Sequence, residues 1–123
     1  MDALNPKSLV LLTYKNKVLL MYKSNNSIDE EKHPWCLIGG IKEKEESFEN
    51  AMSRWVEKEM GIKIENVEYV SDYCYHARLT DDNVNKIQRA ENQLLDFFTL
   101  KEVKNLFLSN TTAQFISKYG ALI

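Results

Sequence analysis

Two hydrophobic segments, residues 8–14 and 18–22, open the chain and are separated by the polar residues Lys15-Asn16-Lys17. Both segments are rich in side chains that favour buried strands. Asparagine readily adopts the positive φ angle that a tight hairpin turn requires. The pattern therefore predicts a β-hairpin that turns at Asn16.

A third hydrophobic segment, Trp35-Cys36-Leu37-Ile38, ends at Gly39-Gly40 and predicts a short strand. The region that follows repeats hydrophobic side chains at three- and four-residue spacing, namely Phe48, Ala51, Met52, Trp55 and Val56. This spacing is typical of one face of an amphipathic helix. We expect that helix to begin after the N-cap Ser47 and to end at Gly61.

The second half of the chain predicts further strands followed by helices. Residues 62–78 alternate loosely and indicate two strands with a turn around Asn66. Asp81-Asp82-Asn83 indicates a loop, and residues 92–99 indicate another strand. Residues 100–108 and 111–119 indicate two short helices, the second capped by Thr111 or Thr112 and ended by Gly120. This order predicts an α/β fold of the α+β kind, with a mixed sheet between helices.

Composition narrows the class of protein. A length of 123 residues predicts a single domain, residues 1–123, and 44% hydrophobic with 28% charged residues is typical of a folded chain. A net charge of −2 gives no general reason to bind nucleic acid or an anionic membrane. No apolar run approaches the roughly 20 residues of a membrane span. The N-terminal residues do not resemble a signal peptide. Cys36 and Cys74 are expected to be buried free thiols, with a disulfide or a zinc pair as the alternative, so we expect a cytoplasmic protein.

Residues 40–62 resemble the Nudix (MutT-like) box, G-x5-E-x7-R-E-U-x-E-E-x-G-U, in which U is a bulky aliphatic residue. Matching residues are Gly40, Glu46, Arg54, Val56, Glu59, Gly61 and Ile62. Trp55 and Lys58 stand where the family has glutamates. Residues 35–40 also resemble the family's W-x-F-P-G-G segment, with Ile38 in place of proline, and residues 97–103 resemble its closing segment. The resemblance implies a Nudix fold, in which a mixed, curled sheet is sandwiched between helices.

The resemblance also implies an activity, the hydrolysis of a nucleoside diphosphate linked to another moiety with Mg²⁺ or Mn²⁺ as cofactor. Positions 55, 58 and 59 share one helical face, where working members carry metal-binding carboxylates. Here that face keeps only Glu59. By resemblance, the carbonyl of Gly39 and the carboxylate of Glu91 would complete a weak metal site, with Glu59 and Glu91 as the catalytic candidates. The positive charge of Lys58 disfavours a dication further, so we expect the usual activity to be impaired.

Several side chains admit two interpretations. Trp55 either extends the hydrophobic stripe into the core or lies over the cleft, where it stacks on a nucleobase or blocks the former metal site. Lys58 is either a solvated helix residue or an ammonium that contacts a diphosphate directly. Arg78 contacts a phosphate or forms a surface ion pair. By resemblance, Glu46 and Arg54 join ion pairs that brace the loop and the helix, and Gly40 and Gly61 are structural positions of the box.

Three functional hypotheses remain open. The first is a degenerate Nudix protein that binds a nucleotide derivative and hydrolyses it slowly or not at all. The second is an active enzyme in which another side chain activates water, the candidates being Glu91, Glu43, Glu45, His33 and His76. The third is an interaction module that uses the scaffold as a partner or dimer surface, since homodimers are frequent among relatives.

Overall fold

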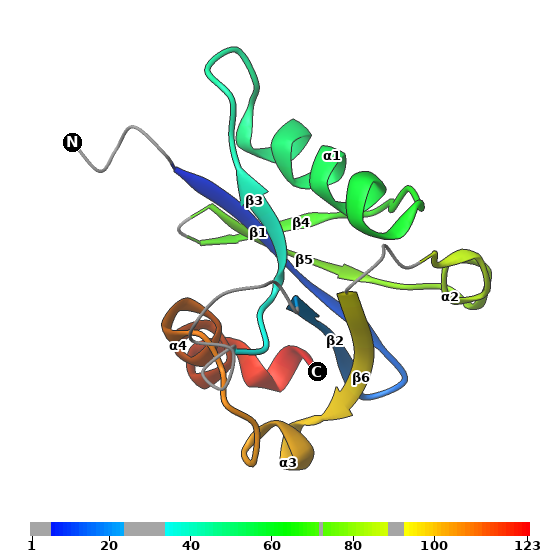
Figure 1. The fold of residues 1–123 in the computed structure, drawn as a ribbon, viewed down its shortest axis with the longest axis vertical. Helices are drawn as coiled ribbons and strands as arrows, with labels where there is room; N and C mark the ends of the chain where they lie inside the picture. The colour runs from blue at the N-terminus through cyan, green and yellow to red at the C-terminus, as the bar shows by residue number, and fades with distance from the viewer. Residues whose placement is uncertain (1–5, 24–33, 72, 89–92) are drawn as a thin grey trace.

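The computed structural model describes residues 6–23, 34–71, 73–88 and 93–123. Within these residues, six strands form one mixed sheet with helices on both of its faces (Figure 1). In chain order the elements are β1 Lys7–Tyr14, β2 Lys17–Lys23, β3 Ile38–Ile41, α1 Phe48–Met60, β4 Glu68–Ser71, β5 Cys74–Arg78, α2 Asp81–Lys86, β6 Gln93–Thr99, α3 Leu100–Val103, α4 Asn110–Tyr119 and the 3-10 helix η3 Gly120–Leu122. The predicted α/β class is confirmed.

Strand β1 is the centre of the sheet, whose order is β4-β5-β1-β2-β6. One edge of β1 pairs in parallel with β5, and its other edge is shared by two antiparallel partners. Residues 12–14 pair with β2, while residues 7–10 pair with β3. The predicted hairpin between β1 and β2 is confirmed, with φ angles of 50° at Lys15 and 65° at Asn16.

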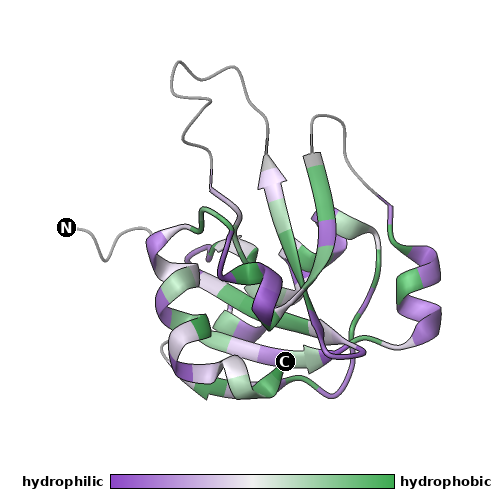
Figure 2. Cartoon of the chain, turned by 90° about the horizontal axis from the view of Figure 1, so that it is seen from below, coloured by the Kyte–Doolittle hydropathy of each residue, from purple (hydrophilic) through white to green (hydrophobic). Residues whose placement is uncertain are grey.

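Two hydrophobic clusters, one on each face of the sheet, hold the helices in place. Along β1 the side chains alternate, so Val10 and Leu12 face α1 while Leu11 faces the opposite side. Helix α1 adds Met52, Val56 and Met60 to the first cluster; α3 and α4 add Val103, Phe115 and Ile116 to the second. Figure 2 shows the resulting mixture of hydrophobic and hydrophilic residues within single strands and helices. The sheet is therefore sandwiched between helices, as predicted.

The limits of α1 follow directly from its sequence. The hydroxyl of Ser47 accepts a hydrogen bond from the backbone N–H of Asn50 at 3.0 Å, as an N-cap does. Gly61 ends the helix with a left-handed φ of 71°, and its N–H donates to the carbonyl of Glu57. Both predicted ends of the helix are confirmed.

Two predicted strand boundaries are wrong. Strand β3 includes Gly39 and Gly40, which pair with Leu9 and Ser8 of β1, whereas Trp35 and Cys36 form only isolated bridges. A Cβ on Gly39 would lie 2.2 Å from the carbonyl oxygen of Ser8, so only glycine permits this pairing. The turn between β4 and β5 falls between Ser71 and Cys74 and not around Asn66.

The second half of the chain also differs from the prediction in its helices. Residues 81–86 form α2 instead of a loop, because Thr80 and Asn83 make a reciprocal capping box. Helix α3 ends at Val103, and α4 is capped by Ser109 and not by Thr111 or Thr112. Thr112 is buried, and its hydroxyl accepts a hydrogen bond from the N–H of Leu37 at 3.0 Å. Gly120 follows Tyr119 as the C-cap of α4, so the predicted end of this helix is confirmed, and the same glycine starts η3.

Two sequence-based expectations concern the protein's environment. Cys36 and Cys74 do not form a disulfide; Cys74 is buried and Cys36 is half-buried. None of the helices in the described part of the chain is long and apolar enough to cross a membrane.

An ion pair between Glu46 and Arg54 joins the loop before α1 to the helix itself. The guanidinium donates to both carboxylate oxygens of Glu46, at 2.6 Å and 2.9 Å. The same carboxylate accepts from the backbone N–H of Glu43 at 2.9 Å. The hydrogen bonds from Arg54, followed by the one from Glu43, lower the pKa of Glu46 to about 2. Glu46 and Arg54 thus form an ion pair that connects the loop to the helix.

We predict that the Glu46→Gln variant loses stability in a pH-dependent way. The ordinary pKa of 4.5 is depressed to about 2 on folding, so the stabilisation is complete above pH 4.5 and disappears as pH falls through about 2. Thermal unfolding from pH 7 to pH 2 should show a lower Tm for the variant that converges on the parent at acid pH. Glu45→Gln is the matched control, because Glu45 is exposed in the same loop. An equal difference at pH 7 and pH 2 would contradict the prediction.

Candidate functional site

Trp55 lies on the backbone of β3. Its indole N–H donates to the carbonyl of Ile41 at 2.9 Å. A Cβ on Gly40 would come within 2.3 Å of the ring, so the indole occupies the space that this glycine leaves. The ring is half-buried and belongs to neither hydrophobic cluster, in contrast to Met52 and Val56. The interpretation in which Trp55 extends the core is therefore wrong, and the indole packs on Gly40 instead.

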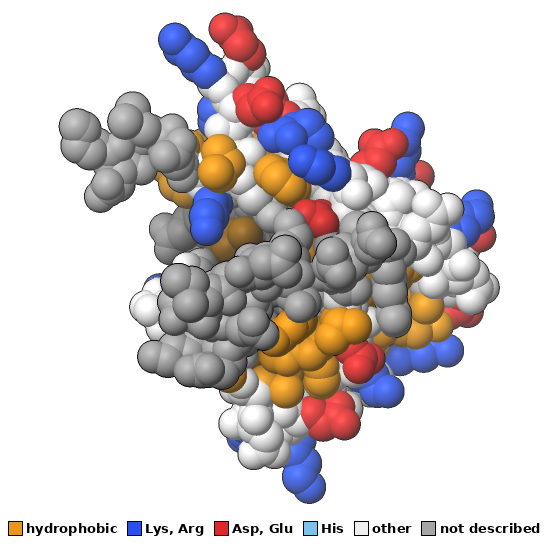
Figure 3. All heavy atoms as spheres, in the orientation of Figure 1, with side chains coloured by type: hydrophobic (Ala, Val, Ile, Leu, Met, Phe, Trp, Pro, Cys, Tyr) orange, Lys and Arg blue, Asp and Glu red, His pale blue; other side chains and the backbone are white. Residues whose placement is uncertain are grey.

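Two cationic side chains lie against the same indole. The ammonium of Lys58 is 4.7 Å from the ring centroid, and the guanidinium carbon of Arg54 is 5.3 Å away. Both distances fall within the range of a cation–π interaction. Figure 3 shows basic and hydrophobic side chains next to each other over β3 and the start of α1. Positions 55 and 58 thus share one face, as predicted, and that face is aromatic and positive.

Glu59 points inward from the last turns of α1. Only 6% of its surface is exposed, although glutamate side chains are usually exposed to solvent. It interacts with a neighbouring group, as a buried charge must. Glu59 is therefore held in place, one residue beyond the solvent-exposed Lys58.

Two of the side chains on this face are not oxygen ligands. Mg²⁺ and Mn²⁺ need oxygen ligands, whereas Trp55 and Lys58 present N–H donors. In the described part of the chain, His, Cys, Asp and Glu do not gather in any group of three that would hold a metal ion. Gly39 lies in β3 with a φ of 145°, and Glu91 falls outside the described residues. Glu59 is the carboxylate that this face retains.

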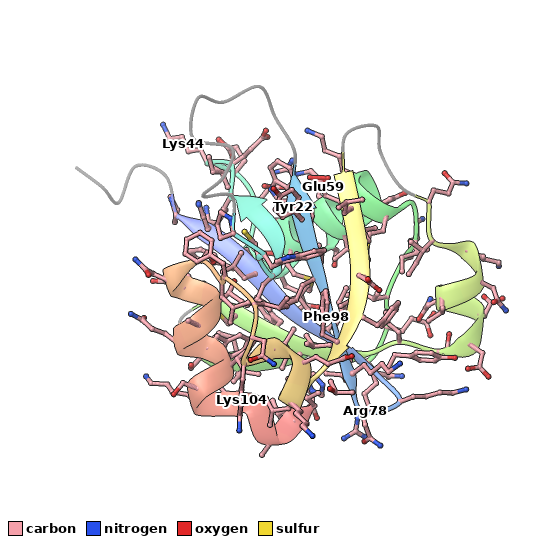
Figure 4. All side chains as sticks on the ribbon, turned by 60° about the horizontal axis from the view of Figure 1, so that its bottom comes forward. Tyr22, Lys44, Glu59, Arg78, Phe98 and Lys104 are labelled. Carbon is pink, nitrogen blue, oxygen red and sulfur yellow. The ribbon has the colours of Figure 1, made fainter. Side chains whose placement is uncertain are left out.

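Arg78 does not join this face. It pairs with Thr13 at one end of β1, whereas Gly40, beneath the indole, pairs with Ser8 near the other end. Five residues of strand separate the two pairings, or roughly 17 Å. Figure 4 shows Arg78 and Glu59 at opposite ends of the molecule. The structure therefore places Arg78 apart from the candidate site.

His76 is not brought to the indole either. His76 is 3% exposed, and its Nε2 lies 2.9 Å from the hydroxyl of Thr13, on the sheet face away from α1. Its Nδ1 lies 3.8 Å from Glu68, too far for a hydrogen bond. Burial, and then the charge of Arg78, lower the pKa of His76. Glu43 and Glu45 are exposed in the loop before α1, and His33 falls outside the described residues.

An aromatic cluster of Tyr22, Trp35 and Phe98 was missed by the sequence analysis. The ring centroids of Tyr22 and Trp35 are 5.3 Å apart, and those of Trp35 and Phe98 are 4.9 Å apart. Figure 4 shows Tyr22 at the same end of the sheet as Glu59, and Figure 3 shows hydrophobic side chains gathered at the surface beside β6. The hydrophobic pattern identifies each strand, but it gives no register between β2 and β6 that would bring these rings together.

Comparison with solved structures finds the same fold in MutT proteins. A MutT NUDIX hydrolase from Burkholderia pseudomallei superposes with a TM-score of 0.74 at 17% identity, over 94% of this chain and 97% of that one. A structure from a study of MutT from Aliivibrio salmonicida and Vibrio cholerae superposes with a TM-score of 0.73 at 16% identity, over 97% of this chain and 98% of that one. A mutT/nudix family protein from Listeria innocua superposes with a TM-score of 0.73 at 19% identity, over 96% of this chain and 92% of that one. At these identities the likeness concerns the fold.

Sequence comparison addresses the family itself. A search of curated proteins finds no match. The NUDIX domain family model, however, matches residues 5–119, which is nearly the whole chain. The box residues, the placement of α1 against β3 and this match agree, and the chain belongs to the Nudix family.

Proposed function

We propose that this Nudix protein binds a nucleoside diphosphate linked to another moiety and hydrolyses the phosphoanhydride slowly or not at all. Nudix hydrolases act on small nucleotide derivatives and generally use divalent metals. One observation carries the proposal: the α1 face that would hold the metal presents the indole of Trp55 and the ammonium of Lys58. Because the fold alone does not specify activity, we base the proposal on the chemistry of this α1 face.

Loss of metal affinity is the first half of the proposal. Glu59, the Gly39 carbonyl and Glu91 are the oxygen ligands that the family resemblance leaves for Mg²⁺ or Mn²⁺. Two carboxylates and a carbonyl bind a dication more weakly than a full set, and the nearby ammonium of Lys58 repels it. Activation of water by a bound metal is therefore impaired.

Retention of a nucleotide site is the second half. Lys58 carries its charge at the position of a metal ligand, where an ammonium binds a diphosphate as a point charge. Lys58 makes the indole face positive on a chain whose net charge is −2, whereas the charge of Arg54 is paired with Glu46. Tyr22, at the same end of the sheet as Glu59, lies against Trp35, and these two rings offer a surface on which a base stacks. We also propose a cytoplasmic location, as expected from the sequence.

Binding without metal tests this second half. ADP or ADP-ribose should raise the Tm of the protein in the presence of EDTA, because Lys58 and not a metal would neutralise the diphosphate. Lys58→Ala should weaken binding roughly tenfold, as expected for a lost charged contact. Lys63→Ala is the matched control, since Lys63 is exposed beyond the end of α1. If no nucleotide shifts the Tm under any condition, the nucleotide site is absent and an interaction module is the better description.

Restoring the carboxylates tests the first half. With Mg²⁺ or Mn²⁺, the parent should release little phosphate from nucleoside triphosphates, ADP-ribose or dinucleotide polyphosphates. The Trp55→Glu/Lys58→Glu variant should bind Mn²⁺ about tenfold or more tightly, because two negative charges replace a ring and a cation. It should also regain some hydrolysis. Trp55→Gln/Lys58→Gln controls for removal of the ring and the cation.

Two results would overturn this half. One is a folded double-glutamate variant that binds Mn²⁺ no better than the parent. The other is rapid turnover by the parent that Glu59→Gln abolishes, which would make the protein an ordinary enzyme.

The position of the indole is tested by coupling Gly40 to Trp55. All three atoms nearest to an added Cβ on Gly40 belong to the indole, so Gly40→Ala should destabilise the parent by about 1–3 kcal/mol. In a Trp55→Ala background the same change should cost much less, which chemical denaturation would measure as a coupling energy. Gly39→Ala is the control: its φ of 145° and the Ser8 carbonyl make it destabilising in both backgrounds. Additive effects of Gly40→Ala and Trp55→Ala would contradict the placement.

A further inference from the structure

A surface groove of about 580 Å³ runs between α3 and α4, on the sheet face away from α1. Leu100 and Val103 of α3 form one wall, and Leu106 and Leu108 extend it. A volume of this size lies within the range of roughly 300–1,000 Å³ seen for binding sites. The aliphatic walls make the groove suited to apolar side chains.

The opposite wall is one face of α4 and η3. The lining positions 113, 116, 117, 120 and 121 recur at helical spacing and extend over about 12 Å at 1.5 Å per residue. Ala113, Ser117 and Ala121 are exposed, and their short side chains leave the groove open. Gly120 brings the wall close to Leu100, since an added Cβ would lie 3.2 Å from a methyl carbon of that leucine.

Charge distinguishes this groove from an ordinary hydrophobic surface. Lys104 and Lys118 line it from opposite walls, and no carboxylate occurs among the described residues that form it. Figure 4 shows Lys104 between α3 and α4. The nearby Glu102 does not line the groove. Its carboxylate accepts a hydrogen bond from the N–H of Thr99 at 2.8 Å in the capping box of α3. The groove is locally positive although the chain carries −2 overall.

We propose that the groove binds an amphipathic helix of another protein, with acidic residues beside its apolar stripe. Helices that bind in grooves insert side chains at i, i+3 or i+4, and i+7, a stripe about 10 Å long, which matches the length of the α4 wall. The two lysines select a partner with negative charges flanking that stripe. The sheet and its two hydrophobic clusters separate this surface from Trp55, so the proposal stands independently of nucleotide binding.

Two synthetic helices with the same leucine stripe, one flanked by Glu and the other by Lys, test the proposal by fluorescence anisotropy. The acidic helix should bind with a Kd at least about tenfold lower than the basic helix at physiological salt. Lys104→Glu/Lys118→Glu should reverse that preference. Lys7→Glu/Lys63→Glu changes the net charge equally at exposed positions on other elements and should preserve it. Ser117→Phe, at an exposed position, should fill the groove and weaken binding while the Tm stays unchanged.

Three results would overturn the proposal. Equal affinity for the two helices, or no binding to either, would show that the lysines do not select an acidic helix. Equal loss of preference in both lysine double variants would indicate a general charge effect. Binding of decanoate, with neither helix bound, would show that the groove takes a small anionic amphiphile instead.

Discussion

The contact between the indole of Trp55 and the backbone of Gly40 fixes the box helix against the central sheet. Because Gly40 carries no side chain, the ring lies directly on β3, and its N–H bonds the carbonyl of Ile41. Arg54 donates to the same carbonyl at 3.1 Å, so two donors from α1 converge on one acceptor of β3. This arrangement joins helix to strand and places an aromatic ring, with Lys58 over it, where family members have carboxylates.

Six of the seven box positions that match the family have structural roles that involve no metal, and the seventh is Glu59. Those six positions are Gly40 under the indole, Glu46 and Arg54 in the ion pair, Val56 and Ile62 in the hydrophobic core, and Gly61 at the left-handed helix end. The two positions that differ, Trp55 and Lys58, lie outside both hydrophobic clusters. Their chemistry can therefore change while the core that specifies the fold is kept. The fold is likewise kept in a structure that superposes with a TM-score of 0.74 at only 17% identity.

The sequence predicted the helix limits that depend on neighbouring residues. The strand limits that depend on pairing between distant segments were not predicted. The box helix was predictable because periodicity, the Ser47 cap and Gly61 all lie within one segment. The extent of β3 was not, because glycines have no side chain to reveal that they pair with β1. The predicted position of the turn after β4 was wrong because the turn contains Tyr73, which has a φ of 65°. The ring of Tyr73 stacks on that of Phe48 of α1, with centroids 3.9 Å apart, and this distant contact cannot be inferred from the neighbouring residues. Likewise, the sequence could not show that parallel pairing of β5 with β1 carries Arg78 to the far end of the sheet.

The two proposed binding surfaces rest on the same physical feature, a lysine ammonium beside an apolar surface. Lys58 lies over the indole on the α1 face, and Lys104 and Lys118 border the groove on the α4 face. A cation in such a place attracts an anionic partner locally, because screening limits charge effects to about 10 Å at ordinary salt. The net charge of −2 therefore does not describe either surface. Since the sheet lies between them and no residue belongs to both, a change that abolishes one function should leave the other intact.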